Sequence, residues 1–244
     1  MDVTEPSRLP PLDEDWERAL CVVAHPDDME YGASSAVARW SAQGKKVAYL
    51  MVTRGQAGIQ GMAPEKTGEL RTREEVASAQ TVGVEDVRFL DLPDGTLEYG
   101  LSLRREIARA IRRHRPQVLV SLNWELTWGG RHLNQADHRV VGLAAIDAAR
   151  DAGNRWIFTD LVEAGLEPWP GARMICFAGS PNPTHGVDVT GYLEQGIRSL
   201  QEQKVYIEGL GGEFDADSFL RGGAEAAGKL MGVDLAVLLE VYAL

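Results

Sequence analysis

A histidine and two aspartates directly follow the first apolar run of the chain. The run 20–24 leads straight into the segment His25–Glu30, which reads HPDDME. Such side chains at the end of a buried strand need partners, because an unpaired buried charge is strongly destabilised. A divalent metal ion would supply that partner, and His25 with Asp28 is a suitable pair of zinc ligands. A third protein ligand from elsewhere would complete an open catalytic site.

The third ligand is expected among the other four histidines of the chain. His114 ends a basic helical stretch, which is typical of a solvated helix terminus. His138 lies near the start of a helix that follows the fourth strand, so we expect it at the same sheet edge as His25. Asp137 beside it is expected to orient a ligand or a catalytic group. Each short motif alone is weak, but their convergence on one edge favours a metal site.

The elements that must position these residues alternate between strands and helices. The expected strands cover residues 19–24, 46–53, 87–91, 117–122, 174–178 and 235–242. The expected helices cover residues 34–43, 67–82, 101–113, 134–149 and 192–208. The early strands are continuously apolar, as in sheets with helices on both faces. The pattern predicts one α/β domain over residues 1–244: a Rossmann-like, mostly parallel sheet flanked by helices, with an irregular segment at 1–17.

The composition is that of an acidic globular protein. Its 244 residues are 44% hydrophobic, which suffices for one substantial core. A net charge of -11 without a basic stripe argues against nucleic-acid binding. We expect a cytoplasmic protein without membrane insertion, because no apolar run approaches the roughly 18 residues of a membrane span and residues 1–17 lack a signal-peptide core. Cys21 and Cys176, each inside an apolar run, are expected to be buried free thiols.

The candidate motifs resemble those of the PIG-L, or LmbE-like, de-N-acetylases. Residues 24–30, AHPDDME, resemble the first signature of that family, and residues 137–142, DHRVVG, resemble its second motif. Arg71 and Glu74 fall where the family has an R-x-x-E helix, and residues 90–95 resemble its D-L-x-D-G loop. The resemblance extends over residues 19–145, and a later segment, THGVDVT at 184–190, is similar to one bacterial branch.

The resemblance implies a zinc-dependent hydrolase acting on an amino-sugar-containing small molecule. It implies the ligands of one Zn²⁺ per chain: His25, Asp28 and His138. Asp27 would be the general base on a metal-activated water, which removes an N-acyl group, typically N-acetyl. Arg71 and Asp94 would contact the substrate, Asp94 through a sugar hydroxyl.

The sequence departs from the family pattern in the second motif, where Ala136 replaces the proline, and at residues 55–58, GQAG, where many relatives carry an acidic residue at the second position. The first histidine of the family's H-P-D-H motif is Gln135 here, and glutamine donates a hydrogen bond but does not shuttle protons at neutral pH. His185, at the end of the proline-containing loop 180–185, is therefore a candidate replacement acid or oxyanion donor. The alternative is a surface histidine, which would leave Gln135 as the donor beside zinc. The candidate catalytic residues are Asp27, Asp137, Gln135 and His185.

Other functions stay open at this stage. An amidase of a thiol conjugate would use the same site, and a metal-binding relative without catalysis would keep its ligands despite Gln135. A nucleotide-binding Rossmann module would bind no zinc, but no G-x-G-x-x-G follows the first strand. Trp124 and Trp128 form either a platform for a sugar ring or anchors of their loop. The sheet edges and residues 151–183 are candidate surfaces for a homo-oligomer contact.

Overall fold

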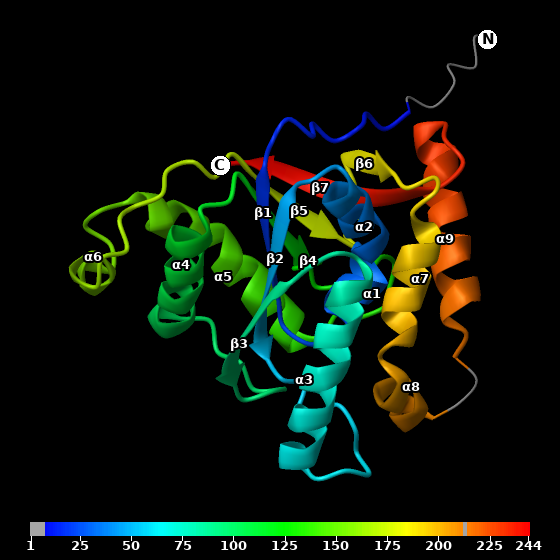
Figure 1. Ribbon diagram of the computed structural model, residues 1–244, viewed down its shortest axis with the longest axis horizontal. Helices are drawn as coiled ribbons and strands as arrows, with labels where there is room; N and C mark the ends of the chain where they lie inside the picture. Colours follow the sequence, from blue (N-terminus) through cyan, green and yellow to red (C-terminus); the bar gives the residue numbers. More distant parts are fainter. Residues whose placement is uncertain (1–7, 212–213) are drawn as a thin grey trace.

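The computed structural model describes residues 8–211 and 214–244 (Figure 1). Within these residues, seven strands form one sheet in the order β3-β2-β1-β4-β5-β7-β6. The strands are β1 Arg18–Val23, β2 Lys46–Thr53, β3 Asp86–Leu92, β4 Val118–Leu122, β5 Met174–Ala178, β6 His185–Asp188 and β7 Ala236–Ala243. β1 to β5 pair in parallel, whereas β7 runs antiparallel to both of its neighbours. The predicted α/β fold with a mostly parallel sheet is confirmed.

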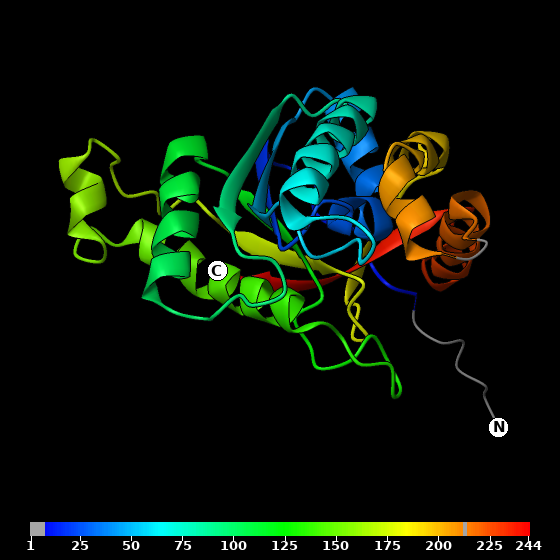
Figure 2. The same cartoon turned by 90° about the horizontal axis from the view of Figure 1, so that it is seen from below.

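Helices cover both faces of the sheet. They are α1 Asp28–Gly32, α2 Ser34–Ala42, α3 Pro64–Thr81, α4 Leu101–His114, α5 Ala136–Gly153, α6 Thr159–Glu163, α7 Leu193–Gln201, α8 Lys204–Leu210 and α9 Ala216–Met231. α4 and α5 cover one face, and α2 and α3 cover the other, with α7 packed outside them (Figure 2). None of the helices in the described ranges is long and apolar enough to cross a membrane.

The continuous apolarity of the strands reflects this double cover. Along β1, Cys21 and Val23 join the core beneath α2 and α3, while Leu20 and Val22 join the core beneath α4 and α5. Successive strand side chains point to opposite faces, so both sets must be apolar when both faces are covered. β3 is only half-buried because it is the edge strand of the sheet.

The C-terminal third departs from the predicted elements. The helix predicted over residues 192–208 is two helices, α7 and α8, because the chain leaves helical geometry at Gln203, with φ -76° and ψ 45°. The side chain of Gln203 points inward and is fully buried, so the break between the two helices brings a polar side chain into the interior.

The sequence analysis did not predict α9. Glycines at 222, 223 and 228 disfavour a helix there. Gly228 is nevertheless required, because a Cβ at this position would lie 2.5 Å from the backbone oxygen of Asp234. Tight packing of the turn after α9 therefore explains the glycine at position 228, although glycine makes a helix hard to predict from the sequence.

The N-terminal segment, from its first described residue to residue 17, has no regular element apart from an isolated bridge between Pro11 and Gly186. It is packed all the same, with Leu12 and Trp16 in the core. The predicted irregularity holds for residues 8–17, and residues 1–7 lie outside the described ranges. Cys21 and Cys176 are buried free thiols, as predicted.

The sheet order creates a crevice beside the first strand. From β1 the chain proceeds to β2 on one side, and β4 lies on the other side. The connections after β1 therefore run to opposite sides of this strand. In open α/β sheets, ligands bind where neighbouring strands are connected in opposite directions, at the carboxyl ends of the strands. His25 follows β1 and His138 lies in the first turn of α5 after β4, so both histidines stand at this crevice.

Candidate metal centre

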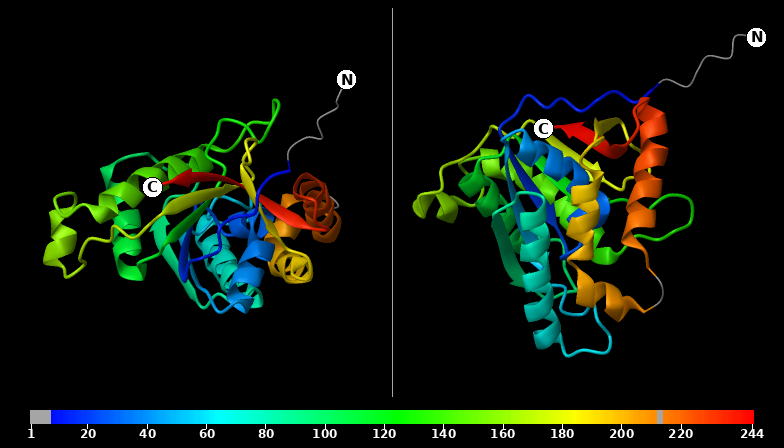
Figure 3. Two further views of the ribbon diagram at one scale, coloured as in Figure 1. Left: turned by 90° about the horizontal axis from the view of Figure 1, so that it is seen from above. Right: turned by 45° about the vertical axis from the view of Figure 1, so that its right-hand side comes forward.

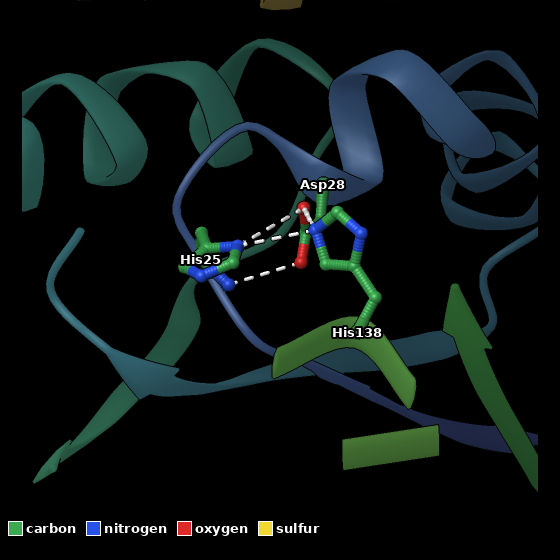
Figure 4. A group of neighbouring side chains, drawn as sticks. All are labelled: His25, Asp28 and His138. Atoms are coloured by element: carbon green, nitrogen blue, oxygen red, sulfur yellow. Dashed lines mark hydrogen bonds and ion pairs between the residues drawn. The ribbon is translucent and has the colours of Figure 1, made fainter. Parts of the chain in front are cut away.

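Three buried side chains converge at the crevice, and all three are the predicted metal ligands (Figure 4). The separations are 3.2 Å between His25 Nδ1 and His138 Nε2, 3.0 Å between His138 Nε2 and Asp28 Oδ1, and 3.7 Å between His25 Nδ1 and Asp28 Oδ1. Tetrahedral zinc with ligands at about 2.0–2.1 Å requires ligand-to-ligand distances of roughly 3.3 Å. The triangle therefore fits a tetrahedral ion with one position left open for another ligand.

The outer nitrogen of each histidine has an oxygen acceptor. Nδ1 of His138 lies 2.9 Å from Oδ1 of Asn134, and Nε2 of His25 lies 3.0 Å from Oδ1 of Asp94 and 3.4 Å from Oδ2 of Asp137. When the outer nitrogens donate to these oxygens, the two inner nitrogens carry lone pairs. Two lone pairs and a carboxylate facing one another repel unless a cation lies between them, so the donor set is suited to a metal ion.

Asp28 is held so that one oxygen faces this position. Its Oδ2 accepts hydrogen bonds from the backbone N–H groups of Ala24 at 3.0 Å and His25 at 2.9 Å, which leaves Oδ1 toward the histidines. Burial would raise the pKa of Asp28, but His138 and His25 outweigh it and lower the pKa. The carboxylate is thus kept ionised, as a metal ligand must be.

Asp27 occupies a strained backbone position beside the ligands. Its φ is 92°, in the left-handed region that a residue with a Cβ seldom adopts. Its backbone N–H donates to Oε2 of Glu75 at 3.2 Å, and its Oδ1 pairs with Arg71 at 3.1 Å. Burial raises the pKa of Asp27 to about 6, although Arg71 counteracts this effect. Strain of this kind at a buried titratable group is typical of an active site.

Arg71 is fixed on several sides within the site. Its guanidinium donates to the carbonyl oxygens of Pro26 and, at 3.3 Å, Gly55, and its Cζ lies 3.9 Å from the ring centre of Tyr206. Gly55 makes this possible, because a Cβ there would lie 2.1 Å from Nη1 of Arg71. The structure therefore shows Arg71 as the partner of Asp27, and its predicted contact with substrate stays a prediction.

Asp94 and Asp137 both lie beside Nε2 of His25, the nitrogen that faces away from the candidate metal position. Asp137 also accepts hydrogen bonds from the N–H groups of Gly95 at 2.7 Å and Leu97 at 3.2 Å. Burial would raise its pKa, but the hydrogen bonds from His25 and this loop lower it. Asp94 accepts from the N–H of Ala57 at 2.7 Å through its other oxygen. Both carboxylates thus lie against the outer nitrogen of His25, and the role of Asp137 in orienting a ligand stays a prediction.

A cavity of about 410 Å³ opens over the three ligands. Its wall includes Tyr31, Tyr206 and Trp128, whose ring centre lies 5.6 Å from that of His138. Trp128 belongs to the loop 123–134, which lies against the segment after β5 (Figure 3). Trp124 packs instead against Phe177 on β5, with ring centres 6.1 Å apart. Of the two tryptophans, the structure places Trp128 where a sugar ring could stack and Trp124 in an anchoring role.

The two candidates for the missing histidine are placed very differently. Gln135 stands at the N-cap position of α5 without a side-chain capping hydrogen bond, and it lines the cavity. His185 begins β6, four strands from β1, which corresponds to roughly 19 Å at the usual strand spacing. Its Nδ1 lies 2.9 Å from Oγ1 of Thr184. The prediction that His185 enters the site is therefore wrong: sheet pairing with β7 places it at the far edge.

The structure also brings in residues that the sequence analysis missed. Asn134, which orients His138, lies one helical turn before it and could have been found from this spacing. Glu75 lies four residues after Arg71 on α3, so the two face the same side. Gln203 lies at the break between α7 and α8 and Tyr206 lies on α8, and no sequence pattern links them to the motifs around β1.

His114 is also placed differently from the prediction. It is half-buried rather than solvated, and burial lowers its pKa. It ends α4 near the amino end of β1, whereas the candidate metal site lies beyond the carboxyl end of that strand. Arg18, the first residue of β1, donates to the carbonyl oxygen of His114 at 3.1 Å.

Comparison with known proteins places the chain among the de-N-acetylases. The profile of the GlcNAc-PI de-N-acetylase family, PIG-L, matches residues 20–149. The chain is 30% identical over 193 residues to diacetylchitobiose deacetylase of Thermococcus kodakarensis, covering 77% of this chain and 69% of that protein. It is 31% identical over 212 residues to 1D-myo-inositol 2-acetamido-2-deoxy-alpha-D-glucopyranoside deacetylase of Kineococcus radiotolerans, covering 71% of this chain and 55% of that protein.

A solved structure shares the whole fold. N,N'-diacetylchitobiose deacetylase from Pyrococcus horikoshii superimposes with a TM-score of 0.84 over 94% of this chain and 85% of that chain, at 22% identity. The likeness extends beyond the matched profile into the C-terminal part, which supplies Gln203 and Tyr206.

Proposed function

The chain belongs to the GlcNAc-PI de-N-acetylase (PIG-L) family, and on that premise we propose that it is a zinc-dependent hydrolase that removes an N-acetyl group from an amino-sugar-containing small molecule. The observation that carries the proposal is the convergence of His25, Asp28 and His138 beside the buried carboxyl of Asp27. The deacetylase activities in the names of both similar enzymes support the same reaction.

The side chains of the site can divide the work of amide hydrolysis among them. A zinc ion, when bound by the three ligands, supplies Lewis acidity for the amide carbonyl and for water. Asp27 takes the proton of the attacking water and returns it to the leaving amine. Arg71 holds the carboxylate of Asp27 in place, and Asp137 fixes the ring of His25. Gln135 donates a hydrogen bond to the oxygen that becomes negatively charged.

The remaining cavity wall suits a sugar. Trp128, a residue that is 37% exposed, offers an apolar ring on which the face of a pyranose can pack. Asp94 offers a carboxylate oxygen for a hydroxyl group, and Arg71 offers donors if its contact with Pro26 opens. We assign both residues as substrate contacts.

The proposal is tested by loading the purified chain with zinc and measuring acetate release and new primary amine from N-acetylglucosamine glycosides. We expect one zinc per chain and turnover that a chelator abolishes and added zinc restores. Asp27→Asn is the matched control, because it removes the base and keeps the ligands. Absence of zinc would overturn the metal assignment, whereas bound zinc without turnover of any amino sugar would indicate a metal-binding relative without this activity.

A further inference from the structure

A second cavity of about 520 Å³ adjoins the catalytic cavity. Ala57 and Asp94 line both cavities, so the two spaces meet at these residues. The side chain of Asp94 is 6% exposed and stands at this boundary, with one oxygen toward His25 and the other on the N–H of Ala57. A molecule bound at the metal position and larger than one sugar ring can therefore continue into this groove.

The groove has a strongly negative lining. Glu65 and Glu69 lie on its α3 wall, Asp91 lies near the end of β3, and Asp94 lies in the turn that follows β3. The one cation among its described lining residues is Arg54, which is already paired with Asp91 at 2.7 Å. Asp94 in turn lies 3.0 Å from Nε2 of His25, so Glu65 and Glu69 are the two carboxylates of this lining that have no ion pair among the described residues. Such a wall accepts hydrogen bonds from hydroxyl or ammonium groups and repels phosphate or carboxylate groups.

Two local features of the groove are unfavourable for folding. Glu65 and Glu69 are like charges four residues apart on one helix, which is unfavourable, and neither forms an ion pair within the described residues. Asp91 has a φ of 60° although it is not glycine. Gly68 lies within α3 between the two glutamates, and a Cβ there would lie 3.1 Å from Cγ of Gln56 on the facing loop, so close packing explains this glycine. Breaches of local preference gathered around one cavity point to a functional constraint.

We propose that this groove is the subsite for the sugar residue that is linked to the N-acetylated sugar, and that it selects neutral or cationic saccharides over anionic conjugates. The inference rests on the proposed function, because the reacting acetamide must lie at the metal position. It narrows the substrate class to oligosaccharides or neutral glycosides of an N-acetylated amino sugar. Conjugates with a phosphate or a carboxylate next to the sugar are disfavoured.

The test compares three compounds that carry the same reacting acetamide: methyl N-acetylglucosaminide, N,N'-diacetylchitobiose and N-acetylglucosamine 1-phosphate. For the zinc-loaded enzyme we expect kcat/KM to be about tenfold or more higher for the disaccharide than for the methyl glycoside, because remote contacts raise kcat/KM. The phosphate should be the poorest substrate, and salt should improve it by screening the repulsion.

The variant Glu65→Gln/Glu69→Gln removes two of the groove charges. It should raise kcat/KM for the phosphate relative to the disaccharide by about fivefold and weaken the salt effect. The control Glu163→Gln/Glu225→Gln changes the net charge equally at exposed positions outside both cavities and should leave the ratio unchanged. An unchanged ratio in the groove variant, or equal kcat/KM for disaccharide and methyl glycoside, would overturn the subsite.

If none of the three compounds is hydrolysed, the proposed function fails and calorimetric titration with the same compounds decides the subsite. Binding of the disaccharide that is tighter than that of the methyl glycoside and weakest for the phosphate would support it. Equal binding of all three, or none, would refute it.

Discussion

The backbone N–H of Asp27 donates to Oε2 of Glu75 at 3.2 Å, and Gln203 donates to the same oxygen at 2.9 Å. This carboxyl group, fully buried on α3, therefore joins the strained turn after β1 to the break between α7 and α8. Arg71, one helical turn earlier, holds the carboxylate of the same aspartate. Two residues of α3 thus hold Asp27, the proposed base: Glu75 holds its backbone and Arg71 holds its side chain. Glu75 is therefore a positioning residue.

Replacing Glu75 with leucine should lower kcat by about 10- to 100-fold while KM and metal content stay near their original values. The reason is that the N–H of Asp27 loses its acceptor, so the left-handed turn relaxes and the base moves, and a 1 Å misplacement can cost about 100-fold. Glu75→Gln keeps an acceptor oxygen and should restore most of the rate. Steady-state kinetics with metal analysis checks this. A leucine variant that loses metal, or a glutamine variant as slow as leucine, would contradict a positioning role.

The stability of the protein should depend on pH through Glu75. Burial, together with the charge of Glu30, raises the pKa of Glu75 well above its ordinary value of 4.5. The folded state then holds a proton that the unfolded state releases, so the contribution is full below about pH 4.5 and is lost as pH rises toward the folded pKa.

The glutamine variant does not titrate, so it serves as the reference. The free energy of unfolding of the wild type, relative to Glu75→Gln, should fall by up to about 1.4 kcal/mol for each pH unit above 4.5. Urea unfolding of both metal-free proteins between pH 4 and 8 measures it. Parallel curves for the two proteins across this range would show that the pKa of Glu75 is not raised.

That the three candidate metal ligands lie together could be predicted from the sequence, because parallel strands bring their carboxyl ends to one edge. His25 and Asp28 follow β1 directly, and His138 follows the neighbouring β4, so adjacency in the sheet was enough to join them. The acidic neighbour Asp137 could be assigned to orient a ligand for the same reason.

The position of His185 could not be predicted by the same reasoning. Its motif lies in the chain between β5 and β7, but β6 pairs on the outer side of β7 rather than near β1. Strand order is set by the packing of α9 and the antiparallel strands, which a local motif does not contain. Gln203 was missed for a related reason: its inward turn depends on an acceptor 128 residues away, on α3.

Replacing His138 with alanine should reduce zinc content from one per chain to near zero. The reason is that the set of three ligands, His25, Asp28 and His138, loses one member. Two protein ligands then remain for an ion that usually takes four ligands. Metal analysis after equilibrium dialysis at fixed free zinc measures the loss. His132→Ala is the matched control, since His132 is exposed on the nearby loop and outside the triangle. Full zinc content in His138→Ala would mean that the ion lies elsewhere.

Asp27→Asn should lower turnover by about 10²- to 10⁴-fold and leave metal content near one per chain. Asparagine keeps the size of the side chain and an oxygen for Arg71, but it cannot take the proton from water. Metal content measured on the same samples separates loss of the base from loss of zinc. Near-normal turnover in Asp27→Asn would show that another group acts as the base.

The last prediction concerns the oxyanion donor. With His185 at the far edge of the sheet, Gln135 is the residue at the family's histidine position that lines the cavity. Its side chain makes no hydrogen bond to any residue in the described ranges, and its backbone only begins α5, so it is free to reach a substrate. Gln135→Ala should therefore lower kcat by about tenfold or more, less than the 10²–10³ of a sole donor because zinc shares the charge.

Restoring the histidine distinguishes a donor from a passive wall. In Gln135→His the imidazolium would donate to the oxyanion, and this form is lost as pH rises through its pKa, ordinarily about 6.5. The kcat profile of Gln135→His should then gain a decline on the basic side that the wild type lacks, because glutamine does not titrate. Gln135→Glu should be slower than Gln135→Ala, since a carboxylate repels the developing negative charge. If all three variants keep the wild-type kcat and pH profile, the side chain at position 135 does not stabilise the oxyanion, and zinc with backbone donors must do so alone.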